Sequence, residues 1–217
     1  MVRSMPATSI TYLLDPLCGW CYGASPVLQQ LGQHPGMRVE LAPTGLFAGT
    51  GGRTLDVAFA DYAWTNDMRI AQLTGQRFTP QYRTQVLGKL GSRFDSASAT
   101  LALTAVALTA PARELAALKV LQEARYVQAL DTGSVAVVAR LLRGMALDAA
   151  ADLLHADDAQ LAAANAARMV KAQGLKQAFG AQGVPALIVT DGKGSRMLRG
   201  NALYGRFESL LAEIAAA

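Results

Sequence analysis

Apolar and polar positions near the start of the chain follow the period of two strands separated by a helix. Residues 9–14 are a short run of β-branched, aromatic and leucine residues that ends at an Asp-Pro pair, a pattern typical of a buried strand followed by a turn. Apolar residues recur at helical spacing over residues 22–32 and alternate with polar ones over residues 37–43. This part of the chain therefore predicts a strand, a helix and a second strand, joined by a right-handed crossover.

The middle of the chain, residues 53–177, is rich in alanine, keeps a helical period and shows no strand-like alternation. Its longest apolar stretch, residues 101–110, is far shorter than the roughly 20 residues that span a bilayer, so we expect a buried helix and no membrane partner. Capping residues and helix breakers predict the other helix ends. These residues are Pro111, Gly133, Ser134, Gly144, Asp148, Asp157, Asp158 and Gly174.

Strand character returns near the end of the chain. Residues 185–190 and 195–199 are separated by a glycine-rich turn, which predicts an antiparallel hairpin. Residues 204–215 place apolar side chains on one face of a final helix. The element order is thus βαβ, a helical insertion and ββα, an α/β class. The predicted domains are an α/β domain and an insertion domain, formed by residues 1–50 with 178–217 and by residues 51–177.

The composition excludes several classes of protein. The 217 residues are 52% hydrophobic, which is too apolar for a disordered chain, and two cysteines cannot hold together a disulfide-dense secreted scaffold. The net charge of +4 comes from scattered basic residues, so we expect no nucleic-acid partner. The first residues lack the apolar run of a signal peptide. We therefore expect a cytoplasmic protein, with a periplasmic location open only if a leader has been removed.

The two cysteines form the motif Cys18-Gly19-Trp20-Cys21 at the junction of the first strand and the first helix. Residues three apart on a helix are close enough for a disulfide. The unpaired N–H groups and the dipole at a helix start stabilise negative charge, so the helix end should favour the thiolate of Cys18. We expect Cys18 to be the nucleophile and the more deeply placed Cys21 to be the resolving thiol.

Other uses of the cysteine pair are weaker. A zinc site needs two further ligands, and beyond carboxylates only His34 and His155 could supply them. A haem-attachment motif has a histidine directly after the second cysteine, where this chain has Tyr22. A purely structural disulfide would close so small a loop that it would add little stability. We therefore expect redox chemistry and no metal.

The residues around the cysteines resemble the DsbA family of thioredoxin-fold thiol-disulfide oxidoreductases. The Asp-Pro pair that ends at Pro16 and the aromatic Tyr22 after the motif are most similar to its FrnE-like branch. The late Gly183-Val184-Pro185 matches the family's second motif. The resemblance implies a thioredoxin-like fold with a helical insertion, and a cis-proline at Pro185 against the active-site disulfide. It also implies that the Val184 backbone pairs with an extended substrate segment.

The chain departs from strongly oxidising members of that family at Trp20, where they carry a histidine that stabilises the thiolate. Because an indole carries no charge, we expect a milder oxidant. Trp20 either contacts substrates or covers the disulfide. The acidic residue Asp15 is more typical of a turn former than of a proton acceptor near Cys21.

The predicted function is that of a protein-disulfide oxidoreductase or isomerase that exchanges disulfides with protein or small thiols. Its redox-active disulfide would need no further cofactor, and glutathione or a thioredoxin-type reductant would be its partner. Two alternatives stay open: a glutathione-dependent transferase or isomerase of the kappa-class or hydroxychromene carboxylate isomerase type, and a peptide-binding module without turnover. The redox direction, the substrate and the oligomeric state do not follow from the sequence.

Overall fold

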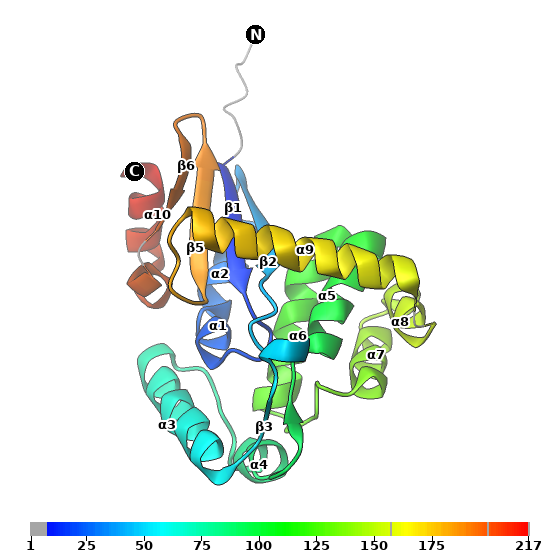
Figure 1. Cartoon of the computed structure of the whole chain (residues 1–217). Coiled ribbons are helices and arrows are strands. Elements are labelled where there is room, and N and C mark those ends of the chain that lie inside the picture. Colours follow the sequence, from blue (N-terminus) through cyan, green and yellow to red (C-terminus); the bar gives the residue numbers. More distant parts are fainter. Residues whose placement is uncertain (1–7, 157, 199, 217) are drawn as a thin grey trace.

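The structure, a computed structural model, describes residues 8–156, 158–198 and 200–216. Its central sheet has four strands in the order β2-β1-β5-β6, seen at the top of Figure 1. The strands are β1 (Thr8–Leu14), β2 (Met37–Pro43), β5 (Ala186–Asp191) and β6 (Gly194–Met197). β1 runs parallel to β2 and antiparallel to β5, and β5 pairs antiparallel with β6. The predicted βαβ unit and the predicted hairpin are both confirmed.

Short helices complete the α/β part of the chain. Between β1 and β2 lie α1 (Gly19–Gly23) and α2 (Ser25–Gln33), which the sequence predicted as one helix over residues 22–32. The chain ends in the 3-10 turn η4 (Gly200–Tyr204) and in α10 (Phe207–Ala216), so the last helix begins three residues later than predicted. Arg199, at the end of the predicted hairpin, lies outside the described residues.

The insertion is mainly helical. Its helices are α3 (Val57–Thr74), α4 (Pro80–Tyr82), η2 (Arg83–Leu87), α5 (Ala97–Thr109), η3 (Pro111–Arg113), α6 (Glu114–Tyr126), α7 (Val135–Gly144), α8 (Asp148–His155) and α9 (Ala159–Ala178). The 3-10 helix η1 (Gly49–Gly51) precedes it. The prediction of a region without strands is wrong in one place, because β3 (Arg53–Thr54) pairs with β4 (Arg93–Phe94). A two-residue strand is too short to show alternation.

Several predicted helix ends move when tertiary contacts are present. The helix that opens at Pro111 stops at Tyr126 rather than at Gly133, and Ala129 in the following turn has a positive φ of 57°. α9 runs through Gly174 to Ala178, because a glycine weakens a helix interior without forbidding it.

The predicted helix N-caps are partly correct. Asp158 caps α9 by accepting from the backbone N–H of Leu161, and Ser134 precedes α7 without a side-chain cap bond. Asp148 is the first residue of α8 rather than its cap. Asp157 lies outside the described residues.

Side chains of β1 alternate between two packed layers. Leu13 packs with Ala172 of α9 and with Ile188 of β5 on one face of the sheet, and Figure 1 shows α9 crossing that face and continuing over the insertion. Ile10 and Tyr12 point to the other face and belong to a larger apolar core. That core continues without a break into the helices of the insertion. Among the described helices, none combines the length and the apolar character needed to cross a membrane.

Candidate functional site

The two cysteines lie where β1 gives way to α1. Cys18 is the N-cap residue of α1 with an extended backbone, and its N–H donates to the carbonyl of Asp15 at 3.1 Å. The Cys18 side chain accepts no capping hydrogen bond, and it lies at the helix end whose N–H groups have no partner within the helix. Cys18 keeps 8% of its surface exposed whereas Cys21 has none, and both are free thiols. Cys21 is the deeper of the two, as the sequence predicted.

The environment of Cys21 keeps its thiol neutral. Burial raises the pKa of Cys21 well above its ordinary value, and the hydrogen bond and charge repulsion from Cys18 raise it further. A hydrogen bond with the backbone of Asp15 acts in the opposite direction. Because only a thiolate attacks a disulfide, Cys21 is held inactive until its proton is removed.

The second predicted motif lies against Cys18, although it is far away in sequence. The peptide bond between Val184 and Pro185 is cis. Sγ of Cys18 donates to the carbonyl oxygen of Val184 at 3.7 Å. The structure thus brings Cys18, Cys21, Val184 and Pro185 together, whereas Pro16 lies in the turn before α1.

Three tyrosine hydroxyls hold the backbone of the motif, and the sequence analysis identified none of them. Tyr12 of β1 donates to the carbonyl of Cys21 at 3.2 Å, and Tyr126 of α6 donates to that of Leu17 at 2.7 Å. Tyr204 of η4 donates to the carbonyl of Trp20 at 3.1 Å and packs edge-on against its indole. Burial raises the pKa of each of these tyrosines. They therefore remain neutral donors that fix the motif carbonyls.

Asp15 is a turn former that also ties the motif to its surroundings. Its carboxylate is fully buried and accepts from the N–H of Leu17 at 2.9 Å. The other oxygen accepts from the N–H of Phe47 at 3.0 Å and from the hydroxyl of Ser96 at 2.8 Å. Burial raises the pKa of Asp15, although the hydrogen bonds and the nearby Arg125 lower it. Three donors from three segments agree with the structural role that the sequence favoured.

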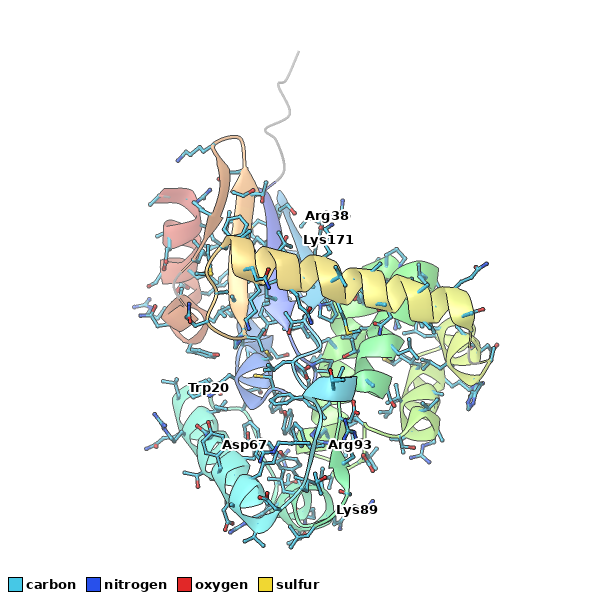
Figure 2. All side chains as sticks on the ribbon, viewed as in Figure 1. Trp20, Arg38, Asp67, Lys89, Arg93 and Lys171 are labelled. Carbon is cyan, nitrogen blue, oxygen red and sulfur yellow. The ribbon has the colours of Figure 1, made fainter. Side chains whose placement is uncertain are left out.

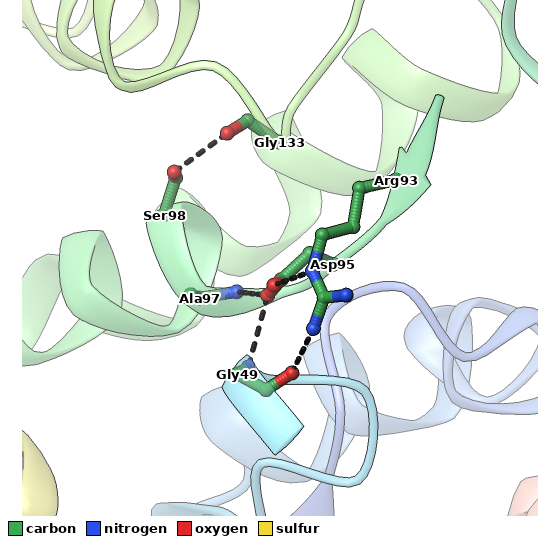
Figure 3. Close-up of polar contacts among 6 residues, drawn as sticks. All are labelled: Gly49, Arg93, Asp95, Ala97, Ser98 and Gly133. Carbon is green, nitrogen blue, oxygen red and sulfur yellow. Dashed lines mark hydrogen bonds and ion pairs between the residues drawn. The ribbon is translucent and has the colours of Figure 1, made fainter. Parts of the chain in front are cut away.

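The loop that carries Phe47 is fastened to the start of α5. Asp95 accepts from the N–H of Gly49 at 3.1 Å and from that of Ala97 at 2.8 Å, as Figure 3 shows. Arg93 donates to Asp95 at 3.0 Å and also to the carbonyl of Gly49. Ser98 nearby donates to the carbonyl of Gly133 at 2.6 Å. The bonds of Arg93 and Asp95 fix the loop that carries Phe47 to the start of α5.

α3 packs directly on the short helix that begins at the cysteines. Gly19 and Gly23 lie one turn apart on the same face of α1. A Cβ atom on Gly23 would lie 2.7 Å from Cγ2 of Ile70, and one on Gly19 would collide with Oδ1 of Asp67. The glycine inside the cysteine motif is thus required by the approach of α3, and its side-chain position is filled by a carboxyl group from the insertion.

Asp67 is a functional candidate that the sequence analysis missed. It is only 4% exposed, and its Oδ2 accepts from the hydroxyl of Tyr82 at 3.1 Å. Burial raises the pKa of Asp67 to about 7, whereas the Tyr82 hydrogen bond and the charge of Arg125 lower it. The sequence feature that could have identified Asp67 is its helical spacing from Phe59 and Ile70, which places an acid on the apolar face of a helix.

A cavity of about 300 Å³ opens between the motif and α3. Four of its lining residues, Cys18, Gly19, Trp20 and Val184, are among the predicted site residues. Most of the others are apolar or aromatic side chains, and the polar ones are Asn66, Asp67, Lys176 and Gln182. Such a mixture of apolar walls and a few polar groups is typical of a small-molecule or peptide site. The arrangement can place a substrate sulfur atom beside Cys18.

Comparisons with known proteins agree with this geometry. Residues 10–212 match the family model described as DSBA-like thioredoxin domain. The structure is similar to the cytosolic disulfide reductase DsbM from Pseudomonas aeruginosa, with a TM-score of 0.84 and 28% identity over 96% of this chain and 100% of that one. The same Pseudomonas protein with GSH gives 0.82 at 28% identity, covering 96% and 98%.

A more distant likeness supports the fold alone. A putative protein disulfide isomerase from Nitrosomonas europaea is 21% identical, with a TM-score of 0.79, and the match covers 96% of each chain. A search of curated proteins finds no match.

Proposed function

The chain belongs to the DSBA-like thioredoxin domain family, and on that premise we propose that it is a thiol-disulfide oxidoreductase that works as a disulfide reductase. The observation that carries the proposal is the position of Cys18. Cys18 is the N-cap residue of α1, its thiol contacts the carbonyl of Val184, and it lines the cavity, whereas Cys21 is fully buried. The reductase direction is supported by the likeness to DsbM, a cytosolic disulfide reductase, and we propose a cytoplasmic location for the same reason.

The proposed reaction transfers two electrons from the dithiol to a substrate disulfide. The thiolate of Cys18 attacks one substrate sulfur, the substrate S–S bond breaks, and the leaving thiolate takes up a proton. Cys21 then loses its proton and attacks Sγ of Cys18. This step releases the second substrate thiol and leaves a Cys18–Cys21 disulfide. Two thiol molecules, oxidised to their own disulfide, restore the dithiol.

We propose glutathione as that thiol. The Pseudomonas protein has been solved with GSH, and the cavity volume of about 300 Å³ is at the lower end of the range for small ligands. In this proposal an extended segment of the substrate pairs with the backbone at Val184, in the manner of an added strand, while Trp20 forms part of the apolar wall. Pro185 holds the segment in place beside Cys18.

Serine substitutions test the assignment of the two thiols. Cys18→Ser should abolish the reduction of a glutathione mixed disulfide, because the remaining thiol, Cys21, is fully buried. Cys21→Ser should stop after the first exchange and accumulate one glutathione per chain on Cys18, measured by mass spectrometry. Undiminished turnover in Cys18→Ser would overturn the proposal, and circular dichroism would verify that both variants are folded.

The same proteins separate the proposal from its alternatives. Conjugation of glutathione to an electrophile by Cys21→Ser, at the rate of the unmodified chain, would favour a transferase instead. Peptide binding by a chain without either cysteine, together with no turnover by the unmodified chain, would favour a binding module. The expectation of a milder oxidant is tested by the equilibrium with glutathione, where a potential as high as about −120 mV would contradict it.

A further inference from the structure

Asp67 brings a titratable acid to the end of the helix that holds the nucleophile. It comes from the insertion, yet one of its oxygens occupies the space where a side chain at position 19 would lie. Asp67 and Cys18 both line the cavity between α1 and α3. Figure 2 labels Asp67 and Trp20 in this part of the molecule. The reaction proposed above assigns Asp67 no role.

The groups around Asp67 leave its charge largely uncompensated. From α4, the Tyr82 hydroxyl donates to Oδ2 at 3.1 Å, and from α6 the buried Arg125 attracts the carboxylate. The Arg125 guanidinium lies over the rings of Tyr82 and Phe94, 5.6 Å and 4.9 Å from their centroids. Among the described residues, Arg125 takes part in no ion pair. Its charge is shared with a second acid, since it also lowers the pKa of Asp15.

Apart from Arg125 and from Lys176 at the cavity boundary, the ionisable groups near this junction are acids. Cys18 and Cys21 belong to the motif, and Tyr126 of α6 donates to the motif backbone. Burial raises the pKa of Tyr126 most, and the charges of Asp67 and Cys18 raise it further, so Asp67 and Cys18 each lie within electrostatic range of Tyr126. A negative charge on Asp67 and one on Cys18 would therefore be added to the same buried region.

We propose that Asp67 is a positioning residue that tunes Cys18 through charge, so that its ionised form opposes the Cys18 thiolate and makes the Cys18–Cys21 pair a stronger reductant. The proposal rests on the proposed function. The N-terminus of α1 stabilises one negative charge, and a carboxylate beside Gly19 competes for that stabilisation. Destabilising the thiolate destabilises the dithiol form relative to the disulfide, which favours electron donation to a substrate.

The effect should depend on pH in the neutral range. Burial raises the pKa of Asp67 to about 7, so the acid is neutral well below that pH and charged well above it. Well below pH 7 the carboxyl adds no charge beside the motif and the thiolate is unopposed. The opposition grows as the pH rises through about 7 and is complete well above it.

The test compares the unmodified chain with Asp67→Asn, which keeps the size and the hydrogen-bond acceptor but removes the charge. At about pH 8 the equilibrium with glutathione should move about tenfold toward the dithiol in the variant, which corresponds to a potential about 30 mV higher. The two proteins should coincide at pH values well below 7. A constant difference at every pH, as a merely structural role would give, or no difference at pH 8, would overturn the proposal.

A second readout separates this proposal from the proposed function. The alkylation rate of Cys18 by iodoacetamide, followed against pH with Cys21 replaced by alanine, should reach its midpoint at lower pH when Asp67→Asn is present. This measurement reports the thiolate even in a protein that reduces no substrate. If the serine variants contradict the reductase proposal but the alkylation midpoint still shifts in Asp67→Asn, only the reductase proposal is overturned.

Two further variants serve as controls. Asp61→Asn removes a carboxylate of the same helix whose side chain is 65% exposed and paired with Arg83, and it should leave both readouts unchanged. Tyr82→Phe removes the hydroxyl that lowers the pKa of Asp67. The glutathione equilibrium of Tyr82→Phe should therefore begin to differ from that of Asp67→Asn at a higher pH than the equilibrium of the unmodified chain does. If Asp67→Asn does not fold, an unchanged pH profile in Tyr82→Phe still overturns the proposal.

Discussion

The α/β part of the chain carries the reacting thiols, whereas the insertion supplies most of the walls around them. Cys18, Cys21 and the Val184 carbonyl come from two short segments beside the central sheet. Tyr126, Tyr82 and Asp67 come from helices of the insertion. The chemistry is thus encoded locally, while the charge and polarity around it are set by residues far away in sequence.

The two regions also differ in how each tolerates change. The α1 helix has five residues and two glycines against α3, so it owes its position to close packing. α9 has 20 residues and contains Gly174, where an added Cβ atom would meet no other atom within 4 Å. α1 is constrained at both glycines by α3, whereas α9 leaves open space at Gly174.

The largest expected effect is a pH-dependent gain in stability on Asp67→Asn. The folded-state pKa of Asp67 is raised to about 7, so the folded protein binds this proton more tightly than the unfolded chain. The stability that this carboxyl group contributes is fully present below its pKa in the unfolded chain, and it is lost as the pH rises through its folded-state pKa of about 7. Asp67→Asn should raise the free energy of unfolding by about 2–4 kcal/mol at pH 8 and by little near pH 4.

Urea unfolding at the two pH values measures this difference. Asp61→Asn is the matched control because it removes an exposed charge from the same helix. Equal effects of Asp67→Asn at pH 4 and pH 8 would show that the carboxyl is not destabilised by burial.

A somewhat smaller effect is expected from Gly19→Ala. The added Cβ would collide with Oδ1 of Asp67 and lie 3.2 Å from Cδ1 of Ile70, so α1 or α3 must shift. Overpacking of this kind costs about 1–3 kcal/mol. Gly174→Ala, in open space within α9, should instead stabilise by about 0.5–1 kcal/mol.

Thermal unfolding distinguishes the signs of the two glycine substitutions. In the double variant with Asp67→Ala, the cost of Gly19→Ala should fall because the colliding oxygen is absent. The same cost in both backgrounds would indicate that α3 does not determine the residue at position 19.

Tyr126→Phe should destabilise the protein less than Gly19→Ala does. It removes a buried donor and leaves the carbonyl of Leu17 without that bond, which costs about 1–2 kcal/mol. Because Leu17 precedes the nucleophile, the reduction rate should fall as well. Tyr62→Phe, whose residue is 66% exposed, should leave the free energy of unfolding unchanged, and an equal loss of stability in both variants would contradict the role of the hydrogen bond.

Much of the fold was predictable because strands and helices leave a local period in the sequence. β1, β2, β5 and β6 all lie where alternation or an apolar run indicated them. The β3–β4 pair was missed because two residues carry no period. The extension of α9 through Gly174 was missed because packing against the sheet outweighs the weak helix propensity of one glycine.

The sequence by itself determined the two thiols, their order at a helix start and the late proline, because these depend on residue type and on spacing within one turn. Only the tertiary structure decided what surrounds them. Asp67, Tyr126 and Tyr204 are separated from the motif by many residues, and no local pattern indicates which acid or hydroxyl will be buried beside it. Burial raises the pKa of Asp67, and burial is a property of the packed chain rather than of any segment.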